Sequence, residues 1–136
     1  MATKLRTSLS LKSKYYISKE RRLELKHFCL QYHEWEDEIF KLNYYPTISG
    51  ERIKDRYGYD DPTAAAVMMR EEYERRLDMI RMAADTLDDP ISPDIFKAVT
   101  NDLTWPYFES HGIACGRDYF YDRYKRFFYI LDQIRM

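Results

Sequence analysis

The chain ends in a stretch that reads Thr104-Trp105-Pro106-Tyr107-Phe108-Glu109-Ser110-His111-Gly112-Ile113, then Ala114-Cys115-Gly116, then an aromatic segment from Arg117 onward. Thr104 is a typical helix N-cap, and Pro106 falls in the first helical turn, where proline is tolerated. Gly112 suits the residue just after a helix end. The stretch therefore predicts a short helix, a turn, and a last helix from about Gly116 or Arg117 to Ile134. This is the outline of a helix-turn-helix.

A second cap-plus-proline start, Ser92-Pro93-Asp94, predicts another short helix that ends at about Asn101. Together these segments give three helices within residues 91–136. We interpret that range as a helix-turn-helix subdomain.

The composition favours an all-α fold. Among 136 residues there are only four Gly and five Pro, while 45% are hydrophobic and 16% are aromatic. Such a chain can bury a core, and it is rich in good helix formers.

The formal net charge of −1 hides a strong asymmetry. Residues 1–26 hold eight Lys/Arg and two Glu, and residues 111–136 hold five Lys/Arg and three Asp. Residues 27–110 hold nine Lys/Arg against eighteen Asp/Glu. Basic ends permit a local phosphate-binding surface, although the near-neutral total argues against indiscriminate coating of nucleic acid.

We expect residues 1–17 to form a basic flexible arm, anchored at its end by Tyr15, Tyr16 and Ile17. Ser18 should cap a long helix from about Lys19 to Asn43 whose apolar residues recur at intervals of three and four. A second long helix, opened by Asp61-Pro62-Thr63 and closed by Asp88-Asp89-Pro90, has the same spacing. Residues 44–61 contain Pro46, Gly50 and Gly58, so we predict a long loop there. Two long helices joined by one loop should pack side by side, so we predict that residues 18–90 form an antiparallel helical hairpin.

The last helix divides into a buried side and an outward side. An apolar stripe should pack on the preceding helices and consists of Phe120, Tyr124, Phe127, Leu131 and Ile134. The residues left to contact DNA are then Arg117, Tyr121, Arg123, Lys125 and Arg126. Two carboxylates on the same helix, Asp118 and Asp122, count against a DNA role because phosphate repels them. A charged helical subdomain without a DNA role is the alternative.

Catalytic chemistry is not expected. The sequence holds no nucleophile elbow, phosphate-binding glycine loop or metalloprotease motif, so we predict that the chain is not an enzyme and uses no cofactor or metal. Cys29 with His33 and His111 with Cys115 have a spacing that a zinc site could use, but burial explains both thiols better. Residues Met1-Ala2-Thr3-Lys4 lead into polar sequence, so we expect a cytoplasmic protein with reduced thiols and no membrane segment.

The chain resembles small phage and prophage transcriptional regulators of the ArpU/RinA type. The resemblance rests on the Asp61-Pro62-Thr63-Ala64 helix start, the helix around Tyr16-Ile17 to Tyr32, and the terminal run Cys115 to Phe128, which is similar to a sigma-factor region-4 helix-turn-helix. It covers about two-thirds of the chain. It implies an all-helical regulator of phage gene transcription in a bacterial host, with a recognition helix that carries Arg117, Tyr121, Arg123 and Lys125.

Our leading hypothesis is a sequence-specific DNA-binding regulator whose last helix enters the major groove of double-stranded DNA. RNA polymerase, and a second copy bound through the helical hairpin, are further partners that this hypothesis allows. Two alternatives belong to other classes. One is a small terminase-like DNA-packaging protein, and the other is a phage-encoded interaction module that inhibits a host complex.

Overall fold

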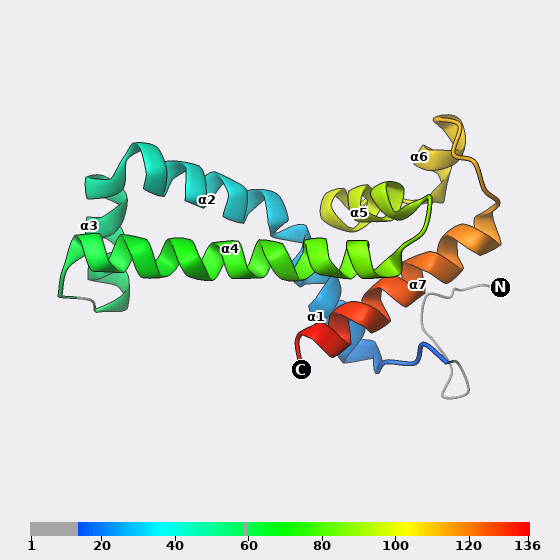
Figure 1. Cartoon of the computed structure of the whole chain (residues 1–136), viewed down its shortest axis with the longest axis horizontal. Coiled ribbons are helices and arrows are strands. Elements are labelled where there is room, and N and C mark those ends of the chain that lie inside the picture. Colours follow the sequence, from blue (N-terminus) through cyan, green and yellow to red (C-terminus); the bar gives the residue numbers. More distant parts are fainter. Residues whose placement is uncertain (1–13, 59) are drawn as a thin grey trace. The chain divides into compact units, whose positions relative to one another are not determined.

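The structure is a computed structural model, and it describes residues 14–58 and 60–136. Within these residues the fold is all-α, as predicted, and contains no strand. The helices are α1 Lys19–Leu30, α2 Tyr32–Tyr44, α3 Pro46–Tyr57, α4 Pro62–Leu87, α5 Ser92–Asn101, α6 Trp105–Ser110 and α7 Arg117–Ile134 (Figure 1). Most residues of the predicted arm, 1–13, lie outside the described part of the chain.

The predicted helix starts at Ser18 and Asp61 are confirmed. The Ser18 Oγ accepts a hydrogen bond from the Arg21 N–H at 3.2 Å, and the Asp61 Oδ1 accepts one from the Thr63 N–H at 3.1 Å. Each side chain satisfies a backbone donor in the first turn of its helix that has no partner within the helix.

The first predicted helix is not continuous. It is broken at Gln31 into α1 and α2. The break coincides with a division of the chain into two compact units. One, here called the central unit, is Gln31–Asp78, and the other, the terminal unit, comprises Met1–Leu30 and Met79–Met136. The predicted boundary at residue 90 differs from this division, because α1 packs against α5 and α7.

The predicted loop at residues 44–61 is wrong, because most of it is helix α3. Pro46 occupies the first turn, and Gly58, with φ of 77°, ends the helix in the left-handed conformation. The residues that indicated a loop are therefore the start and stop signals of a short helix.

The core of the central unit joins α2, α3 and the beginning of α4, with α3 lying across the ends of the other two (Figure 1). Its buried residues are Leu42, Ile53, Ala65, Ala66 and Met69, with Tyr73 packed against them. Gly50 lies where α3 packs tightly on Pro62, the first residue of α4. A side chain there would collide with backbone, which explains a glycine inside a helix.

In the terminal unit, α1, α5 and α7 pack against one another. The predicted apolar stripe of α7 forms much of the core, since Phe120, Phe127 and Leu131 are fully buried. Phe128 is buried as well, which the predicted stripe did not include. At the start of this unit, Ile17 is buried and the Tyr15 ring lies 5.9 Å from that of Tyr129, while Tyr16 remains exposed. The expected anchoring therefore holds for Tyr15 and Ile17.

Candidate nucleic-acid interface

The segment from α6 to α7 has the local geometry of a helix, a tight turn and a second helix. At the end of α6, the Ile113 N–H donates to the Phe108 carbonyl at 3.1 Å and the Gly112 N–H donates to the Glu109 carbonyl at 3.3 Å. Gly112 has a φ of 75°, so it adopts the left-handed conformation that this pair of bonds requires. Gly116 then precedes α7 in an extended conformation.

Aromatic packing fixes α6 onto the first turns of α7. The Phe120 ring is fully buried, and its centroid lies 5.5 Å from that of Trp105 and 5.2 Å from that of Phe108. The Trp105 N–H also donates to the Tyr121 hydroxyl at 3.4 Å. These contacts hold the beginning of α7 in a defined orientation, which a reading helix needs.

Three of the predicted DNA-contact residues form a row along one side of α7. Arg117, Tyr121 and Lys125 are four residues apart, so their side chains follow one another on the helix. Arg117 is exposed in the first turn of α7, and its guanidinium lies 5.7 Å from the centre of the Tyr121 ring. Within residues 14–58 and 60–136, no ion pair engages Arg117 or Lys125. The charge of the exposed Arg117 is therefore available to a ligand, and that of the half-buried Lys125 is not neutralised by a carboxylate of the described residues.

The other two predicted residues have partners inside the terminal unit. The Arg126 guanidinium donates to the carbonyl of Leu87, the last residue of α4, at 3.2 Å. Arg123 pairs with Asp122 and lies 3.9 Å from Asp89, and only 18% of its side chain is exposed. The hydrogen bond with Asp122 raises the pKa of Arg123, although burial works in the opposite direction. Arg123 and Arg126 thus connect α7 to the end of α4.

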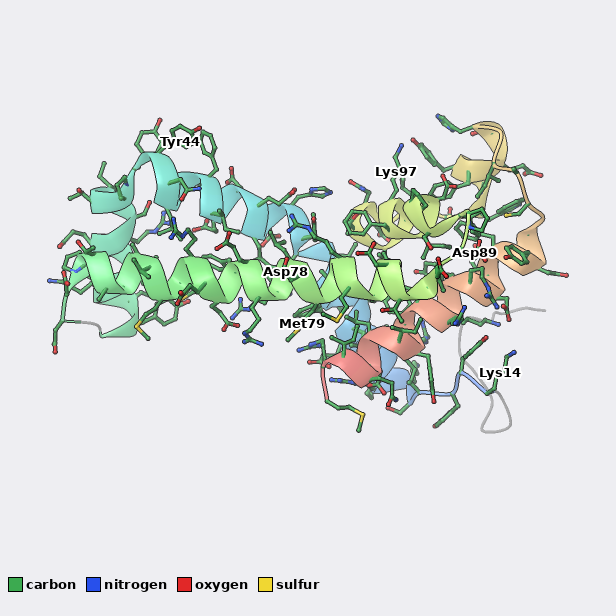
Figure 2. The ribbon with its side chains drawn as sticks, viewed as in Figure 1. Lys14, Tyr44, Asp78, Met79, Asp89 and Lys97 are labelled. Carbon is green, nitrogen blue, oxygen red and sulfur yellow. The ribbon has the colours of Figure 1, made fainter. Side chains whose placement is uncertain are left out.

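Asp89 organises this connection from the segment between α4 and α5 (Figure 2). Its Oδ1 accepts the Ile91 N–H at 3.0 Å, and its other carboxylate oxygen accepts the Tyr119 hydroxyl. Burial raises the pKa of Asp89, but the Ile91 N–H, the Tyr119 hydroxyl and Arg123 outweigh that effect and lower it. Asp89 is therefore held as a carboxylate at neutral pH.

The two aspartates on α7 differ in their surroundings. Asp122 is paired with Arg123, so much of its charge is compensated within the protein. Asp118 is exposed in the first turn of α7, where the helix dipole favours a carboxylate. Of the two charges that counted against a DNA role, only that of Asp118 has no basic partner in the described part of the chain.

Lys97 on α5, next to two rings at α6, is an exposed basic residue that was not predicted from the sequence. Lys97 projects from α5 (Figure 2). Its ammonium lies 5.1 Å from the centre of the Tyr107 ring, and the His111 ring stacks on the same tyrosine at 4.1 Å. The Tyr107 carbonyl also bonds the His111 ring nitrogen at 2.7 Å. Lys97 is the only Lys or Arg of α5, so the sequence of this short helix could have identified it as a candidate contact for phosphate.

The described residues contain no cluster of three His, Cys, Asp or Glu side chains able to hold a metal ion. Cys29 is fully buried, and burial raises the pKa of its thiol. Burial also raises the pKa of the half-buried Cys115, with Asp94 and Asp89 adding to the effect. Neither thiol is activated as a nucleophile.

Residues 14–58 and 60–136 include no helix with the length and apolar character needed to cross a bilayer. Comparisons of the chain with protein-family models, with curated proteins and with solved structures found no match.

Proposed function

We propose that the chain is a sequence-specific DNA-binding regulator of phage gene transcription, with α7 as the helix that enters the major groove. The observation that carries the proposal is the position of Arg117 at the start of α7. Arg117 is exposed, has no acidic partner among the residues that the structure describes, and opens a helix that follows a tight glycine turn. The first residues of a reading helix are those that reach base edges.

The proposal assigns different tasks to the basic residues. Arg117 would read a base, because a guanidinium can bond the O6 and N7 of guanine together. Lys125, two turns further along, and Lys97 on α5 would contact phosphates, and Tyr121 would position Arg117. Arg123 and Arg126 would act indirectly by holding α7 against α4. RNA polymerase is proposed as a second partner, on the resemblance alone.

The test begins with a pool of random-sequence DNA duplexes and the full chain. Repeated selection should enrich one sequence, whose affinity is then measured for the wild type and for Arg117→Lys, which keeps the charge but loses the planar fork. We expect Arg117→Lys to reduce discrimination at one base pair by about 5- to 150-fold, which corresponds to about 1–3 kcal/mol. Lys125→Ala should weaken binding to every sequence alike.

The matched control is Arg75→Lys, because Arg75 is exposed in the central unit and pairs with Glu72. It should leave both affinity and selectivity unchanged. A pool that yields no enriched sequence would overturn the proposal of specific reading. The assignment of Arg117 would be overturned if Arg117→Lys distinguished the enriched sequence from its single-base variants as well as the wild type does.

A further inference from the structure

The central unit carries an exposed group of large apolar side chains where α2 meets α3. This group, the aromatic corner, consists of Phe40, Tyr44, Tyr45 and Ile48, whose exposed fractions are 50%, 67%, 57% and 71%. The Phe40 and Tyr44 rings lie 4.4 Å apart and reinforce each other on one side of α2. Tyr44 points away from α4 (Figure 2). Large apolar patches that remain exposed commonly mark interaction surfaces.

An apolar cavity of about 470 Å³ lies in the same unit, next to the same helix junction. Its lining comes from α2, α3 and the beginning of α4, and includes Leu42, Pro46, Pro62, Ala66, Val67 and Arg70. Pro46 lines the cavity and directly follows Tyr45 of the aromatic corner. Val67 on its wall and the neighbouring Met68 are also exposed.

We propose that the occupant of this cavity is the aromatic corner of a second copy of the chain. Protruding side chains and a cavity that could receive them both lie at the junction of α2 and α3 of the same unit, so two copies related by a two-fold axis can exchange them. In such a dimer each copy inserts Tyr44 into the partner and receives the partner's Tyr44 in return. Aromatic anchors that fill pockets dominate the binding energy of interfaces of this kind.

The available area is sufficient for such a dimer. From the exposed fractions of the aromatic corner with Val67 and Met68, and from the usual size of these side chains, roughly 600 Å² per copy can be buried. The total of about 1,200 Å² lies at the lower end of the range for specific interfaces. We therefore expect a dimer that dissociates in the micromolar range, which is accessible to sedimentation.

One basic side chain near the contact is ion-paired within each copy and another is hydrogen-bonded. Lys41 is paired with Asp37 at 3.2 Å and with Glu38 at 3.6 Å, whereas the Arg70 guanidinium donates to the neutral Asn43 side chain and keeps its charge. The residues 31–78 as a whole hold seven Lys/Arg against twelve Asp/Glu, so two central units repel each other at long range. Salt screens this repulsion and should strengthen the dimer, whereas it weakens contacts with DNA phosphate. Because salt has opposite effects on dimer formation and on DNA binding, either proposal can fail while the other holds.

The experiment is sedimentation equilibrium of the full chain from about 1 to about 200 μM. Wild type should show a monomer–dimer equilibrium. Tyr44→Glu removes the inserted residue and Val67→Glu places a charge in the cavity, so each should weaken self-association at least about tenfold. Tyr57→Glu is the matched control, because Tyr57 is 55% exposed in the same unit but lies outside the corner, and it should dimerise like the wild type.

Mixing the two weak variants sharpens the test. A mixed dimer of Tyr44→Glu and Val67→Glu retains one intact contact of the two, because the first variant supplies an unaltered cavity and the second an unaltered Tyr44. The mixture should therefore associate more strongly than either variant alone, with circular dichroism confirming that both remain helical. A wild type that stays monomeric at the highest concentration, or a mixture no stronger than its components, would overturn the proposal.

Discussion

Gly50 offers the sharpest test of the packing of the central unit. It lies inside α3, and a methyl group built on it would lie 2.4 Å from the carbonyl oxygen of Pro62 and 3.0 Å from the carbonyl carbon. Both atoms belong to the backbone, so they cannot rotate away. A Gly50→Ala variant must separate α3 from the first turn of α4.

Two effects oppose each other in this variant. Alanine is the better helix former, by about 0.8–1 kcal/mol in an open helix. Overpacking a filled contact costs about 1–3 kcal/mol, and the shift would also loosen the core around Ile53, which is only 3% exposed. We expect the steric effect to win, with a net loss of about 1–2 kcal/mol in the free energy of unfolding and a fall of roughly 3–8 °C in Tm.

The assay is urea unfolding followed by circular dichroism. The control is the pair Glu51→Ala and Glu51→Gly at the adjacent exposed position, which measures the alanine–glycine difference in α3 without a clash. Because Glu51 lies inside the helix α3, Glu51→Gly should be about 1 kcal/mol less stable than Glu51→Ala. A Gly50→Ala variant that gains stability would refute the close approach of α3 to α4.

Three further predictions concern the terminal unit. Asp89→Asn should lower the free energy of unfolding at pH 7 by about 1 kcal/mol. Because the folded pKa of Asp89 is lowered, the stability that its carboxylate contributes is complete above about pH 4 and is lost as the pH falls through that folded pKa. The free energy of unfolding should therefore fall less steeply with acid in the variant than in the wild type. Arg126→Met keeps the aliphatic stem but loses the bond to the Leu87 carbonyl, and should destabilise by about 1 kcal/mol in the same assay, whereas Arg117→Met should change stability little. An alkylating reagent followed by mass spectrometry should modify Cys115 in the folded chain and reach Cys29 only at the rate of unfolding. Rapid modification of Cys29 would contradict its burial.

The starts and ends of several helices could be predicted because local residues determine them. Ser18 and Asp61 cap their helices as expected, and Arg117–Ile134 is the predicted last helix. The helix α3 was missed because a proline and a glycine that bracket a short helix also occur in loops. The glycine inside it is explained only by the backbone of Pro62, which is brought near by folding. The break at Gln31 contains neither proline nor glycine. It follows from the division of the chain into two units, which no local pattern indicates.

In the candidate site, too, local spacing could be read from the sequence and long-range contacts could not. Helical spacing predicted five outward residues on the last helix, and of these Arg117 is exposed while the other four are half-buried. The same spacing could not show that Arg126 bonds a carbonyl 39 residues earlier in the chain. Nor could it show that Arg123 approaches Asp89. Such long-range partners decide which basic side chains remain available to a ligand.

DNA binding at two salt concentrations tests the central proposal most directly. The affinity of the full chain for the selected duplex is measured at about 50 and about 200 mM salt, for the wild type, for Arg117→Ala combined with Lys125→Ala, and for the control Arg75→Ala. We predict that wild type and control bind tightly and lose affinity with salt, and that the double variant binds more weakly, with a logarithmic salt slope smaller by about one, because Lys125 contacts a phosphate and Arg117 a base. A wild type that does not bind DNA at the lower salt concentration would contradict the account, and so would a double variant with an unchanged slope.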